Sequence, residues 1–201
     1  TIPSRYRGDP LSGLLGPVRL VSREWPESSG EVAAATAASV GESEEQAGLR
    51  YTYASGAGTL AADNLLKDAA LFKASGKAGH PGGGRDFTAL FNGQVLNGAG
   101  TEVSENDGRT FVGFGEGDAL TLAFEKAVTL RGACTVACHQ DARASQRYEI
   151  WAAPAAAPER FEKLAAVDRA AESGLNRVDL VRADGKPLAQ KVVAVRFVFK
   201  N

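Results

Sequence analysis

The sequence predicts an all-β protein, built as an antiparallel sandwich of two sheets in the manner of a jelly roll. Apolar and polar side chains alternate over strand-length runs, as at Leu120, Leu122 and Phe124 and again from Val193 to Phe199. Gly-rich or charged breaks separate these runs. A single sheet would leave its apolar face exposed to water. Consecutive short strands joined by tight turns therefore favour two sheets that pack together.

The central stretch, residues 107–153, predicts several strands in succession. Residues 118–124 alternate with period two, and we expect a short turn after them at Glu125–Ala127. A longer strand then follows, with one face formed by Leu130, Cys134, Val136 and Cys138. After a polar loop over 139–147, the next strand begins at Tyr148.

The flanking regions divide the chain into two parts. Residues 1–60 predict an N-terminal extension with two strands, at 17–21 and 49–53. Between these strands, Glu27–Gln46 is rich in Ala, Ser and Glu, which is typical of an exposed linker with a short helix at 31–38. Residues 61–201 predict the sandwich.

The C-terminal region predicts three further strands. Residues 160–167 also fit helical spacing, but Pro158 and the strand-rich surroundings favour a strand. A second strand covers 178–181, and Asp184–Pro187 predicts a tight turn after it. Residues 192–199 alternate so regularly that we expect an interior strand.

Composition narrows the possible functions. The chain has 23 basic and 24 acidic residues and a net charge of −1, which argues against a general binder of nucleic acid or anionic membranes. No apolar run approaches the roughly 20 residues that span a bilayer. Because the chain contains no Met, we expect a processed protein or a fragment of a larger one, and a removed export signal fits this.

The two cysteines, Cys134 and Cys138, allow two interpretations. Four residues apart on a strand, their α-carbons lie about 13 Å from each other, too far for a disulfide. We therefore expect two buried thiols that act as small apolar side chains. A remote alternative is c-type haem attachment, since Cys134-x-x-x-Cys138-His139 is one residue longer than the common motif. With no Met in the chain, only His80 remains as the opposite axial ligand.

A series of segments between residues 64 and 199 has a distinctive order. They are Asn64–Leu66 with Ala69–Ser75, Leu90–Gly93, Asp107–Phe111, Asp118–Phe124, Arg147–Ala152, Phe161–Leu164 and Val193–Phe197. In this order they resemble the galactose-binding-like sandwich, the discoidin or coagulation-factor C-type fold of many carbohydrate-binding modules. Residues 1–60 lie outside the resemblance.

Three features depart from the family pattern. Asn92 stands where the family has Asp before Gly, and Phe111 stands where it usually has Trp. An acidic residue that often completes a calcium site near the family's C-terminus has no counterpart in residues 191–201. The resemblance still implies a structural calcium ion, held by Asn92, Asp107 and Thr110 with nearby carbonyl oxygens. The same three residues are also typical of ordinary turns.

The resemblance further implies that loops at one end of the sandwich hold a ligand. The loops at 76–87 and 139–147 carry the candidates His80, Arg85, Asp86, His139, Gln140, Asp141, Arg143, Gln146 and Arg147. Such side chains hydrogen-bond sugar hydroxyls, while an aromatic ring stacks on the apolar face of the sugar. Phe87 is the nearest loop aromatic, and we expect Trp151, on a strand, in the core. The simpler interpretation is a set of solvated loop charges.

The sequence contains no catalytic signature. Neither of the two histidines lies in a nucleophile motif, and zinc motifs such as HExxH are missing. We therefore expect no enzyme, but a secreted, extracellular or periplasmic module that binds a glycan or a cell-surface partner within a larger protein. The alternative is a structural sandwich that packs against a partner subunit, with the strands at 17–21 and 49–53 completing the interface.

Overall fold

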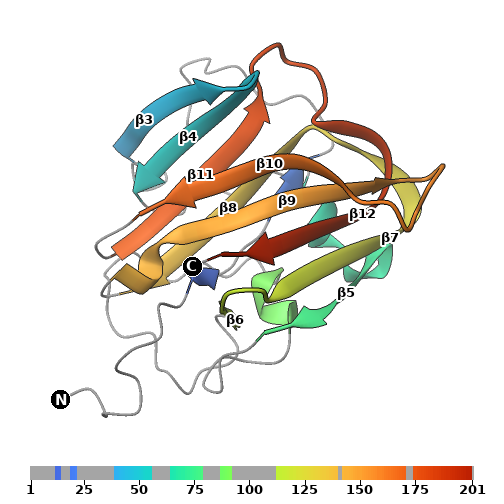
Figure 1. Ribbon diagram of the computed structural model, residues 1–201, viewed down its shortest axis with the longest axis horizontal. Helices are drawn as coiled ribbons and strands as arrows, with labels where there is room; N and C mark the ends of the chain where they lie inside the picture. Colours follow the sequence, from blue (N-terminus) through green and yellow to red (C-terminus); the bar gives the residue numbers. More distant parts are fainter. Residues whose placement is uncertain are drawn as a thin grey trace.

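The computed structural model describes eight stretches of the chain and shows two antiparallel sheets packed face to face (Figure 1). The described residues are 12–14, 19–21, 39–55, 64–78, 87–91, 112–139, 142–170 and 174–200. The predicted all-β sandwich is confirmed. In the part of the chain so described, no helix is long and apolar enough to cross a membrane.

The first sheet has five strands in the order β10-β9-β12-β7-β5. Their bounds are Glu162–Arg169, Gln146–Pro154, Ala189–Phe199, Ala119–Leu130 and Phe72–Lys77. The strands predicted near 160–167 and 192–199 are confirmed, and β12 is an interior strand between β9 and β7. In Figure 1 this sheet lies in front of the second one.

The second sheet has the order β2-β8-β11-β4-β3. Its strands are Arg19–Val21, Gly132–His139, Gly174–Arg182, Leu49–Ser55 and Ser39–Gln46. β2 and β4, the strands predicted in the N-terminal part, pair with β8 and β11, so this sheet contains strands from both sides of residue 60. A short pair, β1 (Ser12–Leu14) with β6 (Val112–Phe114), completes the strand pairing described.

Single-turn 3-10 helices join several strands. They are η2 (Leu65–Lys67), η3 (Ala69–Leu71), η4 (Phe87–Leu90) and η5 (Ala142–Ala144). The linker predicted for 27–46 is wrong at its C-terminal end, because residues 39–46 form β3. A hairpin with β4 pairs the backbone groups along one edge of β3, although the side chains are mostly small or acidic. The helix predicted at 31–38 lies outside the described residues.

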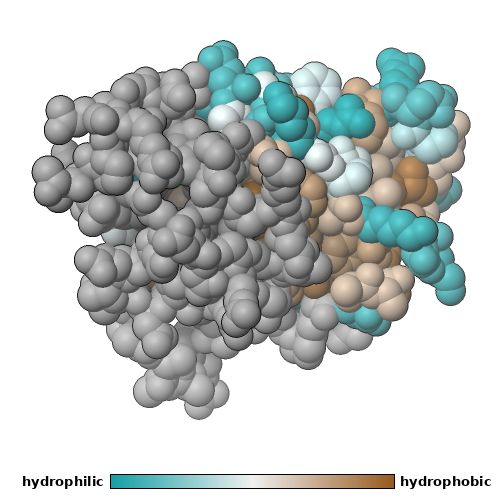
Figure 2. All heavy atoms as spheres, turned by 90° about the horizontal axis from the view of Figure 1, so that it is seen from below, coloured by the Kyte–Doolittle hydropathy of each residue, from teal (hydrophilic) through white to brown (hydrophobic). Residues whose placement is uncertain are grey.

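The core forms where the inward side chains of the two sheets meet. Leu120 and Leu122 on β7 and Phe197 and Phe199 on β12 are fully buried. The Phe199 ring stacks on that of Phe114, with centroids 3.9 Å apart. Seen from below, hydrophilic residues of the described part gather toward its margins and hydrophobic residues lie between them (Figure 2).

The turn predicted at Glu125–Ala127 is wrong, since β7 continues to Leu130. The pairing with β12 shifts there, from Ala123 opposite Ala194 to Val128 opposite Val192. Such a bulge leaves Glu125–Ala127 exposed without ending the strand.

The single apolar face predicted from Leu130 through Cys138 is also wrong, because β7 ends at Leu130 and β8 begins at Gly132. Ala133 of β8 belongs to the main core. Cys134 and Val136 alternate with it, so they lie on the opposite face of β8, where they are buried in a small second cluster with Leu175.

Candidate functional site

Most of the site residues predicted from the sequence lie outside the described part of the chain. These are His80, Arg85, Asp86, Asn92, Asp107, Thr110, Gln140 and Asp141. The backbone of His139 ends β8, but its side chain is not among those described. The proposed calcium ligands and the ligand residues His80, Arg85 and Asp86 therefore stay predictions. The predicted 76–87 loop is wrong at its ends, because Gly76 and Lys77 belong to β5, and Phe87 begins η4 and packs against the core, where its ring stacks on that of Phe114.

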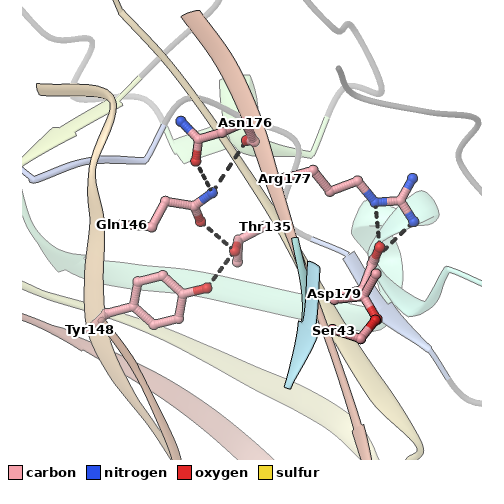
Figure 3. A network of polar contacts seen from close by, with 8 residues as sticks. Ser43, Thr135, Gln146, Tyr148, Asn176, Arg177 and Asp179 are labelled. Carbon is pink, nitrogen blue, oxygen red and sulfur yellow. Dashed lines mark hydrogen bonds and ion pairs between the residues drawn. The ribbon is translucent and has the colours of Figure 1, made fainter. Parts of the chain in front are cut away.

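Gln146 is the clearest departure from the expected ligand loop. It opens β9 and is buried between the two sheets, with only 1 % of its surface exposed. Its Oε1 accepts a hydrogen bond from Thr135 Oγ1 at 2.6 Å, and Thr135 in turn bonds the hydroxyl of Tyr148 (Figure 3). Gln146 thus joins the sheets from within and does not lie on the surface of a loop.

The amide of Gln146 continues this buried network toward β11. Its Nε2 donates to Asn176 Oδ1 at 2.7 Å and to the Asn176 carbonyl at 3.2 Å (Figure 3). Asn176 Nδ2 donates to the Ala144 carbonyl at 2.7 Å. A buried network with partners for both ends of each amide favours one arrangement of the sheets, because unsatisfied polar groups are costly there.

Two arginines of the predicted loop are described. Arg143 lies on η5 and is half-buried. Arg147 lies on β9 and forms an ion pair with Asp168 of β10, with 3.0 Å between Nε and Oδ1. Arg147 alternates with Gln146 and Tyr148, so it lies on the opposite, outward face of the sheet.

That outward face of the first sheet is the candidate site, and we call it the outer face. One row of opposed residues crosses the sheet from β10 to β5, and consists of Lys163, Trp151, Arg196, Thr121 and Ser75. Trp151 is half-buried on this face. The expectation that Trp151 lies in the core is therefore wrong.

Glu149 organises the cations beside Trp151. Its carboxylate accepts from Trp151 Nε1 at 3.1 Å and from Lys163 Nζ at 2.9 Å, and Lys200 Nζ lies 3.6 Å away. The hydrogen bond from Lys163 is the main reason that the pKa of Glu149 lies below its ordinary value. The carboxylate fixes the edge of the indole ring and holds two ammonium groups near it.

Arg196 occupies the middle of the row. Its Nε donates to Thr121 Oγ1 at 3.1 Å, and its guanidinium carbon lies 3.8 Å from the centroid of the Phe161 ring. Phe161 is half-buried and directly precedes β10. The guanidinium is therefore held between a hydroxyl and an aromatic ring.

Small side chains lie between these polar groups on the outer face. Ala166, Ala119 and Ala123 occupy outward positions of β10 and β7, and Val198 and Ala194 do so on β12. A sheet face with one indole, one fixed guanidinium and several amines can stack on the apolar face of a sugar and hydrogen-bond its oxygens.

The outer face was missed from the sequence although a signal for it existed. Tyr148 and Ile150 predict the inward positions of β9, and period-two alternation then places Glu149 and Trp151 outward. Trp151 was expected in the core because Trp is highly buried on average, and this expectation outweighed the alternation.

A second cluster lies on the outward side of the second sheet, around the buried thiol of Cys134. On β11, Arg177 forms an ion pair with Asp179, with 2.7 Å between Nε and Oδ2 (Figure 3). Burial lowers the pKa of Arg177, but Cys134 and Asp179 outweigh it and raise the pKa above its ordinary value.

The strand geometry weighs against haem attachment at Cys134. β8 pairs with β11 without a register shift from Gly132 to His139, so the α-carbons of Cys134 and Cys138 lie about 13 Å apart. Among the residues described, no group of three or more His, Cys, Asp or Glu could hold a metal ion.

Comparisons with protein-family models, with curated proteins and with solved structures find no match to this chain.

Proposed function

We propose that this chain is a non-catalytic glycan-binding module with a galactose-binding-like jelly-roll fold, exported as part of a larger protein. The family resemblance is supported by where its segments lie. Residues 72–75, 118–124, 147–152, 161–164 and 193–197 belong to or adjoin β5, β7, β9, β10 and β12, which are the strands of the first sheet.

One observation carries the proposal: the outward position of Trp151 between Lys163 and Arg196. Glycan sites combine an aromatic ring with a few well-placed polar groups. Glu149 holds the indole edge, and Phe161 and Thr121 hold the guanidinium, so the polar groups are arranged before a ligand arrives. Prior arrangement reduces the ordering that binding requires.

Affinity electrophoresis through gels containing soluble polysaccharides tests this proposal. We expect at least one polysaccharide to retard the protein, and Trp151→Ala to abolish the retardation. Trp151→Phe keeps a ring and should retain part of it. Arg50→Gln, on an exposed arginine of the second sheet, is the control for surface substitutions. Loss of retardation in Arg50→Gln, or full retardation in Trp151→Ala, contradicts this site.

A sandwich that packs on a partner protein is the second candidate. Trp and Arg are frequent at the centres of protein interfaces, and the outer face presents both. The N-terminal strand β4 does not favour it, because β4 already pairs with β11 and β3. Self-association in sedimentation experiments that Trp151→Ala abolishes, without retardation on any polysaccharide, supports this candidate.

We also propose a structural calcium ion held by Asn92, Asp107 and Thr110, as the family resemblance implies. Thermal unfolding with calcium and with EDTA tests it. A higher Tm in calcium that is lost in Asp107→Asn supports the ion, and equal Tm values contradict it.

A further inference from the structure

We infer that the glycan bound on the outer face is anionic: an extended polysaccharide whose carboxylate or sulfate groups pair with the cations of this face. The inference rests on the proposed function and names its ligand class. Two observations carry it, namely the sign of the charges on the outer face and the small side chains that lie between them.

Cations outnumber carboxylates on the outer face. The cations at its outward positions are Lys73, Lys77, Arg147, Lys163, Arg196 and Lys200. The carboxylates that accompany them are Glu149, Asp168, the exposed Glu125 of β7 and the buried Asp118 behind Lys77. Six positive and four negative groups leave a net charge of 6 − 4 = +2 on this face, whereas the chain as a whole carries −1.

The carboxylates do not remove these cations from solvent. The side chains of Lys77, Lys200 and Lys163 remain 81 %, 51 % and 45 % exposed. Exposed ion pairs of this kind are weak and exchange readily with a ligand anion. Arg196 differs, because Thr121 and the Phe161 ring fix its plane, which suits planar recognition of a carboxylate or sulfate.

The surface between the cations favours a chain-like ligand. Ala166 and Ala123 are exposed and Ala119 is half-buried, so small side chains lie between the cations on this face. Strands lie about 4.8 Å apart, so five strands span roughly 19 Å from β10 to β5. Lys163 lies near one end of this span and Lys73 and Lys77 at the other. An extended polymer with repeated anionic groups can meet both ends and the indole at once.

Two polysaccharides with the same sugar backbone test whether the charge of the polymer matters. Dextran and dextran sulfate differ only in their sulfate groups, and polygalacturonate separates carboxylate from sulfate recognition. We expect retardation by dextran sulfate, polygalacturonate or both, with dextran at least tenfold weaker. Increasing salt should weaken the retardation, because charge attraction is screened.

Variants with opposite expected effects distinguish this site from non-specific attraction. Arg196→Gln should weaken the binding of the retained anionic polymer about tenfold, and Glu149→Gln should strengthen it about threefold. Trp151→Ala leaves the net charge unchanged and should still weaken binding at least tenfold. Arg50→Gln is the control for loss of a cation elsewhere, and circular dichroism checks that each variant is folded.

Each outcome decides between the two proposals. Equal or tighter binding of dextran overturns the anionic ligand and leaves the glycan-binding function standing. No retardation on any polysaccharide overturns both. Binding to dextran sulfate that Arg50→Gln weakens as much as Arg196→Gln, or that Trp151→Ala does not change, is charge attraction alone and overturns the anionic-glycan site. Equal binding of single-stranded DNA, tested in parallel, overturns it as well.

Discussion

Thr135 on β8 and Tyr148 on β9 join their hydroxyl groups across the interior, between the two sheets. Because the Thr135 hydroxyl donates to Gln146 Oε1, it accepts from Tyr148. Tyr148→Phe removes one donor and should lower the free energy of unfolding by about 1–2 kcal/mol. Thr135→Val leaves both Tyr148 and Gln146 without this partner and should cost about 2–4 kcal/mol. Urea unfolding measures both changes.

A second hydroxyl pair provides the control for this prediction. The hydroxyl oxygens of Ser43 on β3 and Thr52 on β4 lie 3.2 Å apart, but this pair is exposed to solvent. Ser43→Ala should change stability by less than about 0.5 kcal/mol, since water replaces the lost partner. The double variant Tyr148→Phe/Thr135→Val should lose less than the sum of the single losses. A larger loss from Ser43→Ala than from Tyr148→Phe contradicts the bridging role.

Alkaline pH should destabilise the protein through its tyrosines. Burial raises the pKa values of Tyr51, Tyr53 and Tyr148, and the Glu44 carboxylate adds to the effect at Tyr53. In the unfolded chain these phenols ionise near pH 10, so above that pH the folded state holds more protons. Stability should be fully present below about pH 10 and fall as the pH rises further.

The size of this alkaline effect can be measured on one side chain. Each tyrosine that stays protonated only in the folded state contributes about 1.4 kcal/mol per pH unit to the slope of the free energy of unfolding against pH. Tyr148→Phe should remove one such contribution in urea unfolding between about pH 10 and 11.5. Complete phenol ionisation near pH 10 in the folded protein, followed by absorbance at 295 nm, contradicts the prediction.

Gly76 should resist substitution because β5 passes very close to β7 there. A Cβ at this position would lie 2.0 Å from the carbonyl oxygen of Ala119, and the backbone φ is +154°. Gly76→Ala should cost about 3 kcal/mol or more, since backbone atoms cannot move aside as a side chain can. Gly117→Ala is the control, with a positive φ but nothing within 4 Å of its Cβ. It should cost about 1–2 kcal/mol, and an equal loss at both positions contradicts the steric argument.

Two Arg-x-Asp pairs allow a comparison between buried and exposed charge. Arg177 and Asp179 are each 12 % exposed, whereas Arg182 and Asp184 are 39 % and 38 % exposed. Asp179→Asn should lower stability by about 3 kcal/mol, because the Arg177 charge stays buried without its carboxylate. Asp184→Asn should have little effect, although Arg182 holds the pKa of that carboxyl well below its ordinary value. Urea unfolding measures both changes. Equal losses of the free energy of unfolding in Asp179→Asn and Asp184→Asn would contradict the role of burial.

Much of the first sheet could be predicted from the sequence. Over residues 120–124 of β7 and 193–199 of β12 every second residue is apolar, and this period specifies both the strand and its inward face. β3 and the continuation of β7 could not be predicted, because acidic or polar residues there resemble a linker or a turn. Pairing with a neighbouring strand made both into strands, and a single sequence does not reveal that pairing.

The candidate site was predicted less well than the fold. Arg147 was identified, but the sequence placed it on a loop, and Gln146 beside it proved to be interior. Arg196 comes from a segment far along the chain from Trp151 and Phe161, and only the strand order makes it their neighbour.

By itself, the sequence determined that this chain forms antiparallel strands and which side chains of the regular strands turn inward, because alternation is a local property of the backbone. The tertiary structure decided which strands are neighbours, and through this it placed Trp151 beside Arg196 and Gln146 between the sheets. Contacts between strands depend on how the whole sheet pairs, so residues distant in sequence become one surface only after folding.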